Sequence, residues 1–284
     1  MAGRVDLHLH TTASDGKYRP AEVVRRAAGL GLSVIAIADH DSVDGIAPAL
    51  AAAKSFPGLT VIPCLEVSTD VPRGEVHILG YFIDYTSAEL NAALAHFRDS
   101  REGRAKGMID KLAGMGINIE WRRVKEIAGE GSVGRPHIAQ AMLEKGYITS
   151  FKEAFDKYIA REGPAYVERE KMMPAEAVKL IVRNNGLAVM AHPFTVADVE
   201  AMIVELKPAG LVGIEAYYKN YSAEGKSHLL GLAGKYDLII TGGTDYHGLD
   251  DTDEVMMGGA DVPFEAVESL LALDAQRGIK SGKR

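Results

Sequence analysis

Short apolar segments alternate with longer amphipathic segments along most of the chain. Seven segments are rich in valine, isoleucine and leucine and have the length of a buried strand: Val5–Leu9, Ser33–Ala38, Leu59–Cys64, Val76–Phe82, Leu187–Ala191, Leu211–Ala216 and Leu238–Thr241. The apolar spacing between them is typical of helices, at Pro20–Leu30, Val43–Lys54, Val196–Leu206, Ser222–Lys235 and Pro263–Ala275. Strands that alternate with helices of this length predict an α/β fold of the (β/α)-barrel type.

One long segment interrupts this alternation. Between about Ser87 and Lys171 the pattern predicts only helices, at Ala88–Gly114, Trp121–Ala128, Pro136–Glu144 and Ser150–Ala160. We therefore expect a small all-helical insertion domain at residues 87–172, between a first barrel part at 1–86 and a second at 173–277. The polar tail at 278–284 contains glycine and is expected to be disordered.

Composition and charge exclude several classes of protein. The 284-residue chain has a formal net charge of −7, which argues against a basic nucleic-acid-coating surface or a polybasic membrane patch. Its single cysteine, Cys64, excludes an intramolecular disulfide and a cysteine-based zinc site. The apolar runs are far shorter than the ~20 residues that span a bilayer, and Met1–Arg4 leaves no room for a secretory leader. We expect a cytoplasmic protein with no membrane association and no obligatory protein partner.

Ionisable side chains gather where the predicted strands end. His8 and His10 close the first strand, and their rings converge because residues i and i+2 of a strand project to one face. Asp245 and His247 repeat this spacing after the last strand. The other candidates at or beside strand ends are Asp15, His40, Glu66, His77 and His192. Because the carboxyl ends of barrel strands form one face, we expect these side chains at one site.

Each candidate also has an ordinary structural explanation when it is taken alone. Asp15 fits a turn cap, His77 fits a core histidine, and the His8-x-His10 pair fits the surface of an edge strand. These explanations are independent and would all have to hold together, so we favour a metal site. Nine candidate ligands exceed what one ion can use, which predicts two or three divalent ions. Imidazole and carboxylate ligands without thiolate suit zinc, manganese or iron.

These residues resemble the four motifs of the PHP (polymerase and histidinol phosphatase) family. The resemblance rests on His8-x-His10 with Asp15, Asp39-His40-Asp41, Glu66, His77, Ala191-His192-Pro193 and Asp245-x-His247. It implies a distorted seven-stranded (β/α) barrel, a three-metal site at the strand ends, and phosphoester hydrolysis. It also implies three ligand sets, namely His8, His10, Glu66 and Asp245; Glu66, His77 and His192; and Asp15, His40 and His247.

The helical insertion resembles that of one branch of the family. This branch contains nucleoside 3′,5′-bisphosphate phosphatases and 5′-to-3′ exoribonucleases that act on short RNA. The stretch Gly131–Ala139 is similar to the branch's substrate-gripping element and supplies Ser132, Arg135 and His137 as substrate-binding candidates. Free N–H groups at the start of a helix, together with an arginine, suit a phosphate. An ordinary glycine-rich turn before a helix is the alternative.

We therefore expect a metal-dependent phosphoesterase acting on a nucleoside 3′,5′-bisphosphate, an AMP-like nucleotide or the 5′ end of a short RNA. The reaction would be in-line attack by a hydroxide that bridges the metal ions. The proton donor to the leaving group stays open between a metal-bound water and His137. Three alternatives stay open: a histidinol-phosphatase-like small-molecule phosphatase, a metal-dependent amidohydrolase and a non-catalytic nucleotide-binding module. The second is disfavoured because amidohydrolases usually use a carboxylated lysine at a strand end, and no predicted strand ends in lysine.

Several other polar residues have weaker signals. The cluster Arg98, Arg101, Arg104 and Lys106 is predicted to be a solvated helix face. Glu215 and Tyr217 lie at the end of the sixth predicted strand and would face the site, with Tyr217 as packing at its rim.

Overall fold

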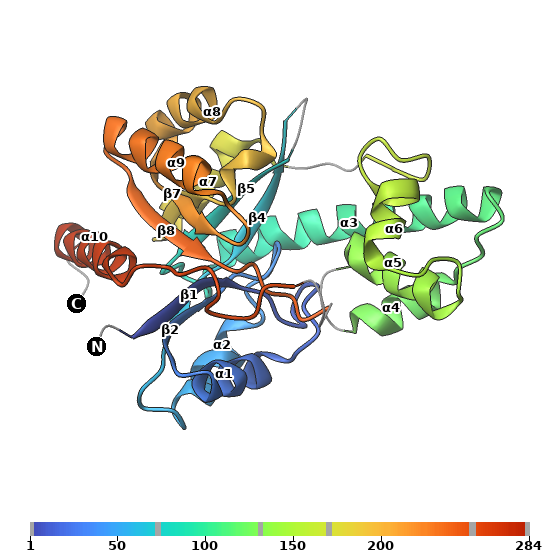
Figure 1. Cartoon of the computed structure of the whole chain (residues 1–284), viewed down its shortest axis with the longest axis horizontal. Helices are drawn as coiled ribbons and strands as arrows, with labels where there is room; N and C mark the ends of the chain where they lie inside the picture. The colour runs from blue at the N-terminus through green and yellow to red at the C-terminus, as the bar shows by residue number, and fades with distance from the viewer. Residues whose placement is uncertain (1–2, 72–74, 130–132, 169–171, 250–253, 282–284) are drawn as a thin grey trace.

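The strands form two sheets that are connected by isolated bridges. The computed structural model describes residues 3–71, 75–129, 133–168, 172–249 and 254–281 (Figure 1). A parallel three-stranded sheet consists of β1 (Arg4–Leu9), β2 (Leu32–Ile37) and β3 (Thr60–Pro63). A five-stranded sheet has the order β4 (Glu66–Asp70), β5 (Glu75–Tyr81), β6 (Leu187–Met190), β7 (Leu211–Tyr218) and β8 (Ile239–Gly243). In it, β5 is antiparallel to both β4 and β6, whereas β6, β7 and β8 are parallel.

Isolated bridges connect the two sheets on both sides. The His10 N–H donates to the Tyr246 carbonyl at 3.0 Å, and the Glu66 N–H donates to the Asp39 carbonyl at 3.1 Å. The described residues therefore form two bridged sheets with eight strands in total. Their pairing does not show the single ring of seven parallel strands that was expected. The strand missing from the prediction is β4. Its sequence, Glu-Val-Ser-Thr-Asp, has one aliphatic residue and thus lacks the apolar run on which the prediction depended.

Helices cover the outer faces of the sheets. Near the three-stranded sheet lie α1 (Pro20–Gly29) and α2 (Ile46–Ala53). Near the five-stranded sheet lie α7 (Pro174–Arg183), α8 (Val199–Leu206), α9 (Ala223–Lys235) and α10 (Glu265–Ser281), with short 3₁₀ turns at Pro193–Thr195 and Lys207–Ala209. Helix α10 continues through Gly278 to Ser281, into the segment for which the sequence predicts a disordered tail; a glycine costs a helix only about 1 kcal/mol. Residues 282–284 lie outside the described residues. No described helix is both long and apolar enough to cross a membrane.

The segment after β5 forms a helical group with its own hydrophobic core. It contains α3 (Ala88–Gly114), α4 (Trp121–Ala128), α5 (Arg135–Glu144) and α6 (Phe151–Ala154), which continues as a π-helical turn over Phe155–Ile159. Helix α3 runs from the sheets to this group (Figure 1). Its first half packs Leu90 and Leu94 into the core beside the five-stranded sheet, and its second half packs Met108 and Leu112 into the core of the helical group. One helix therefore belongs to both cores.

Candidate metal centre

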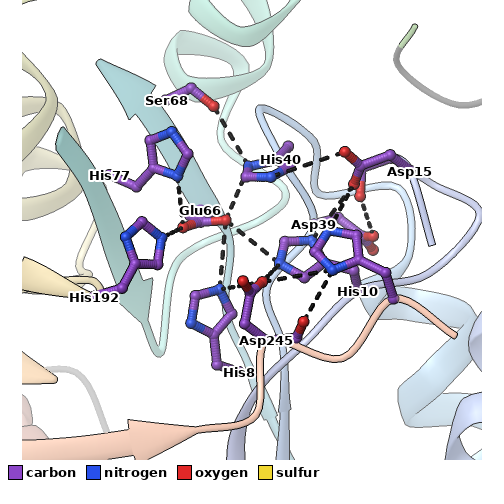
Figure 2. A network of polar contacts seen from close by, with 12 residues as sticks. His8, His10, Asp15, Asp39, His40, Glu66, Ser68, His77, His192 and Asp245 are labelled. Carbon is purple, nitrogen blue, oxygen red and sulfur yellow. Dashed lines mark hydrogen bonds and ion pairs between the residues drawn. The ribbon is translucent and has the colours of Figure 1, made fainter. Parts of the chain in front are cut away.

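Glu66 lies at the middle of a ring of histidines (Figure 2). It is the first residue of β4 and is fully buried. Its Oε1 is 2.9 Å from both His77 Nδ1 and His192 Nε2. Its Oε2 is 2.9 Å from His40 Nδ1 and 3.4 Å from the Nε2 atoms of His8 and His10. One carboxylate thus contacts histidines from both sheets, as expected of a group that bridges two ions.

The remaining predicted ligands complete the same cluster. Asp245 Oδ1 is 3.0 Å from His10 Nε2 and 3.6 Å from His8 Nε2. Asp15 Oδ1 is 3.3 Å from His247 Nε2, and Asp15 Oδ2 is 3.9 Å from His40 Nε2. All nine residues predicted from strand ends are therefore brought together.

Three groups of these residues place their ligand atoms close enough to share an ion. Within each group the atoms lie within 4.8 Å of one another. The groups are His8, His10, Glu66 and Asp245; His10, Asp15, His40 and His247; and His40, Glu66 and His77. The first equals a set implied by the family resemblance, and the second adds His10 to another. In the third, His40 stands where the resemblance implied His192, although His192 also contacts Glu66.

Unsatisfied polar atoms in the cluster fit a bound cation. Buried atoms without a hydrogen bond among the described residues include His8 Nε2, both ring nitrogens of His10, Asp15 Oδ1, Glu66 Oε2 and His192 Nδ1. Burying a polar atom without a partner costs free energy. These atoms are imidazole nitrogens and carboxylate oxygens that face one another, which is the donor set that divalent transition metals accept.

The electrostatics of the cluster without metal show how strongly it favours positive charge. Burial lowers the pKa of His8, but Glu215, Glu66 and Asp245 more than offset this and raise it well above its ordinary value. Burial likewise lowers the pKa of His247, yet Asp15 and Asp245 raise it to about 9.

The pKa values of His10 and Glu66 are lowered instead. Burial and the neighbouring His247 lower the pKa of His10 to about 3. Burial raises the pKa of Glu66, but His40, His77 and His8 hold it well below its ordinary value. Protons on some histidines therefore balance the carboxylates, in positions that metal ions would take.

Buried carboxylates outside the ligand set fix the loops that carry the ligands. Asp39 accepts hydrogen bonds from the Thr11 N–H at 2.7 Å, the Thr11 hydroxyl at 2.8 Å and the Ser14 hydroxyl at 2.7 Å. This holds the turn between His10 and Asp15. Asp6 accepts from the Thr244 N–H at 3.0 Å and hydroxyl at 2.7 Å, beside Asp245. Such orienting groups normally tune both the geometry and the affinity of a metal site.

A cavity of about 180 Å³ opens onto the cluster from the side of the helical group. Its lining includes four members of the metal cluster, three arginines and four further residues: Asp15, His40, His77 and His247; Arg101, Arg104 and Arg135; and Ser68, Glu75, Pro136 and Phe155. Arg101 and Arg104 are 5% exposed, so the predicted solvated helix face is wrong for these two residues. The helical pattern of α3 cannot reveal that this face meets the sheet ends.

Arg101 is fixed to the main body of the protein. Its Nε donates to Asp41 Oδ2 at 2.7 Å, and its Nη2 donates to Ser68 Oγ at 2.6 Å. Asp41 in turn accepts from the Ser68 N–H at 2.8 Å. Arg101 is therefore a fixed cation in the lining of this cavity, and the sequence prediction missed both Arg101 and Arg104 as cavity residues.

The three predicted substrate-binding residues have different positions. Arg135 begins α5, lines the cavity and pairs with Glu75 at 3.1 Å. His137 lines a neighbouring cavity that shares Asp15 and Pro136 with the first, and its Nδ1 accepts the Gly134 N–H at 2.9 Å. Ser132 lies outside the described residues. Arg135 therefore lines the first cavity, and His137 lines the second, beside Asp15.

A lysine follows a strand, contrary to the sequence prediction. Because β7 extends through Tyr217 and Tyr218, Lys219 comes directly after its end. Lys219 Nζ is 3.2 Å from Asp245 Oδ2 and donates to the Asp245 carbonyl at 3.0 Å. The absence of a strand-end lysine therefore cannot be used against an amidohydrolase.

Known proteins share this arrangement. Residues 6–168 match the PHP domain, which is more than half of the chain. The chain is 34% identical over 251 residues to a 5′-3′ exoribonuclease of Haemophilus influenzae, covering 87% of this chain and 91% of that protein. It is 31% identical over 268 residues to a 3′,5′-nucleoside bisphosphate phosphatase of Chromobacterium violaceum, covering 91% and 90%.

A solved structure is also similar over nearly its whole length. It comes from Bifidobacterium adolescentis and is described as a candidate metal-dependent phosphoesterase. It superposes with a TM-score of 0.87 at 27% identity, covering 94% of this chain and 95% of that one. With the family match and the relatives above, these similarities show that the chain belongs to the PHP family.

Proposed function

We propose that this PHP phosphoesterase hydrolyses phosphate esters of nucleotides that carry a second anionic group near the scissile one. The candidates are a nucleoside 3′,5′-bisphosphate and the 5′ end of a short RNA. An AMP-like nucleotide, which carries only the scissile phosphate, would be the minimal substrate. The observation that carries the proposal is a cavity lined both by members of the metal cluster and by Arg101, Arg104 and Arg135. A ligand with two anionic groups can contact both sets of residues. The two relatives named above, an exoribonuclease and a bisphosphate phosphatase, support the same substrate class.

The nine clustered residues would hold two or three divalent ions. Glu66 would bridge, with His8, His10 and Asp245 on one side and His77 and His192 on the other, while Asp15, His40 and His247 would hold the ion nearest the cavity. Imidazole and carboxylate ligands suit manganese, zinc or iron. When bound, the ions supply charge that stabilises the phosphoryl oxygens and lower the pKa of an attacking water toward neutrality.

The arginines would orient the substrate. Arg101 cannot swing freely because Asp41 and Ser68 hold it, so it offers a pre-organised cation. Arg135 pairs with Glu75 and would exchange this partner for a phosphate, which it can bind through two N–H groups. The leaving-group proton stays unassigned between a metal-bound water and His137, which lines the neighbouring cavity together with Asp15.

The helical segment at 87–172 would serve as the substrate cap. It supplies all three arginines, whereas the bridged sheets supply the nine metal ligands. In this proposal the two sheets act as one distorted barrel with the metals at its carboxyl end. The isolated bridges on both sides support that description.

A phosphate-release assay tests the proposal. Purified protein with added Mn²⁺ would be offered adenosine 3′,5′-bisphosphate, AMP, a short 5′-phosphorylated RNA and a panel of amides. His8→Ala should abolish phosphate release with the fold retained. Arg135→Gln should raise KM for the bisphosphate more than for AMP. Arg122→Gln, an exposed arginine on α4, is the matched control and should change neither. Turnover of amides without phosphate release would overturn the proposal.

A further inference from the structure

A buried carboxylate on β7 contacts the metal cluster without belonging to any ligand group. Glu215 is fully buried and pairs in register with Thr241 of β8. Its Oε1 is 3.1 Å from His8 Nδ1, and its Oε2 accepts the His192 N–H at 2.8 Å. Both oxygens therefore have a partner, and neither is among the atoms of the three groups that could share an ion.

The contact with His8 determines which ring nitrogen can bind a metal. A carboxylate accepts hydrogen bonds, so Glu215 favours a proton on Nδ1 of His8. The Nε2 lone pair then points toward Glu66 Oε2 at 3.4 Å and Asp245 Oδ1 at 3.6 Å. Three electron-rich atoms facing one another repel unless a cation lies between them. The same carboxylate also makes the His8 ring a better electron donor.

The contact with His192 stabilises a strained backbone. His192 has φ of 26° and ψ of 63°, in the left-handed region that residues other than glycine rarely adopt. This conformation directs His192 Nε2 to within 2.9 Å of Glu66 Oε1. A strained residue persists only where its surroundings fix it. The hydrogen bond from the His192 N–H to Glu215 is such a restraint.

We propose that Glu215 is a positioning residue that couples the two sides of the metal centre, by fixing the tautomer of His8 and the backbone of His192. This inference rests on the proposed metal site and extends it. The Glu215 side chain then orients His8 of β1 and His192, which follows β6, and these two residues contact different oxygens of the bridging Glu66. Its loss should weaken the binding of more than one ion.

Glu215→Gln is the most direct test, because the variant keeps the size and loses the charge. A glutamine has one carboxamide oxygen where Glu215 has two. It can therefore accept a hydrogen bond from His8 Nδ1–H or from the His192 N–H, but it cannot replace both oxygens of Glu215 as acceptors. Loss of such an orienting carboxylate typically weakens metal affinity by about 10–100-fold. We expect a loss of that size for Mn²⁺, measured by chelator competition, and a changed visible spectrum after Co²⁺ loading. Glu205→Gln, an exposed glutamate on α8, should bind Mn²⁺ like the wild type.

Two further measurements separate positioning from general stability. Mn²⁺ affinity should be compared at a temperature at which metal-free Glu215→Gln is fully folded by circular dichroism, so that the loss reports on the site and not on unfolding. Should this variant fail to fold, Glu215→Asp keeps the charge but is one methylene shorter, and its Mn²⁺ affinity should also fall. In a His8→Ala background, Glu215→Gln should weaken Mn²⁺ binding less than in the wild type, because part of its action passes through His8.

The outcomes distinguish this inference from the proposed function. A wild-type protein that binds no Mn²⁺ and releases no phosphate would contradict the proposed function itself. A wild type that binds Mn²⁺, with Glu215 variants that bind it equally well, would overturn only the role of Glu215. An affinity loss that is the same with and without His8, or that is found only where the metal-free variant is unfolded, would overturn it too.

Discussion

The helical group should be destabilised separately by a cavity in its own core. Leu112 is fully buried on the half of α3 that packs there. Leu112→Ala removes a buried isobutyl side chain and leaves a cavity, which costs about 2–5 kcal/mol. Taking ~3 kcal/mol and an m-value of ~1 kcal/mol/M for a segment of this size, the urea midpoint of the group should fall by roughly 3 M.

The only tryptophan of the chain makes this measurable. Trp121 begins α4 and packs against the core of the helical group, so its fluorescence follows that group, whereas far-UV circular dichroism follows the whole chain. In the wild type the two transitions should coincide, because α3 joins both cores. In Leu112→Ala the fluorescence transition should come first, with Mn²⁺ binding retained and phosphate release lost at intermediate urea.

Leu94→Ala is the matched control on the same helix. Leu94 is 1% exposed in the core beside the five-stranded sheet. This variant should shift both transitions together, because α3 loses its packing when the core beside the five-stranded sheet unfolds. If the two probes still coincide in Leu112→Ala, the reasoning from two cores is refuted and the chain unfolds as one cooperative unit.

Three further predictions concern the cavity and the metal cluster. Arg101→Met leaves Asp41 buried without its cation and should cost about 3–5 kcal/mol in urea unfolding; a loss below 1 kcal/mol would contradict a buried pair. Glu75→Gln removes the carboxylate that pairs with Arg135 and should lower KM for the bisphosphate. An increase in KM would contradict the proposal that Arg135 exchanges Glu75 for a phosphate. Because His247 keeps its proton up to a pKa of about 9 in the metal-free protein, Mn²⁺ binding at pH 8 should release protons and weaken as the pH falls. Calorimetry in buffers of different ionisation enthalpy would show this, and a heat independent of the buffer would contradict it.

The clustered residues could be predicted because strand ends concentrate them. His8 and His10 lie at the end of the first apolar run, Asp245 comes two residues after β8, and the carboxyl ends of the parallel strands lie on one side of a sheet. The number of strands was harder to predict. In β4 the buried positions include Glu66 and Ser68, whose polarity serves the site and removes the hydrophobic signal.

The cavity and the positioning groups depend on tertiary contacts that no local pattern records. Arg101 and Arg104 lie on a helix with cationic residues along its length, and only the meeting of α3 with the sheet ends buries them. Glu215 had a usable signal, since a charged residue within the apolar run Leu211–Ala216 is costly to bury without a partner. That signal placed it at the site, but the two residues that it contacts come from other strands.

Because α3 belongs to both cores, the position of Arg101 beside the metal cluster and the shape of the space formed by the distal helices can change independently. Arg101 is held by Asp41, in the loop after β2, so its position relative to the metal cluster depends on the sheets. The distal helices α4 to α6 share their core with the far half of α3 and carry Arg135 but not Arg101. Sequence divergence in the distal helices can therefore move Arg135 and reshape the space around it while Arg101 keeps its place beside the metal cluster. Related chains with different substrates should differ mainly there.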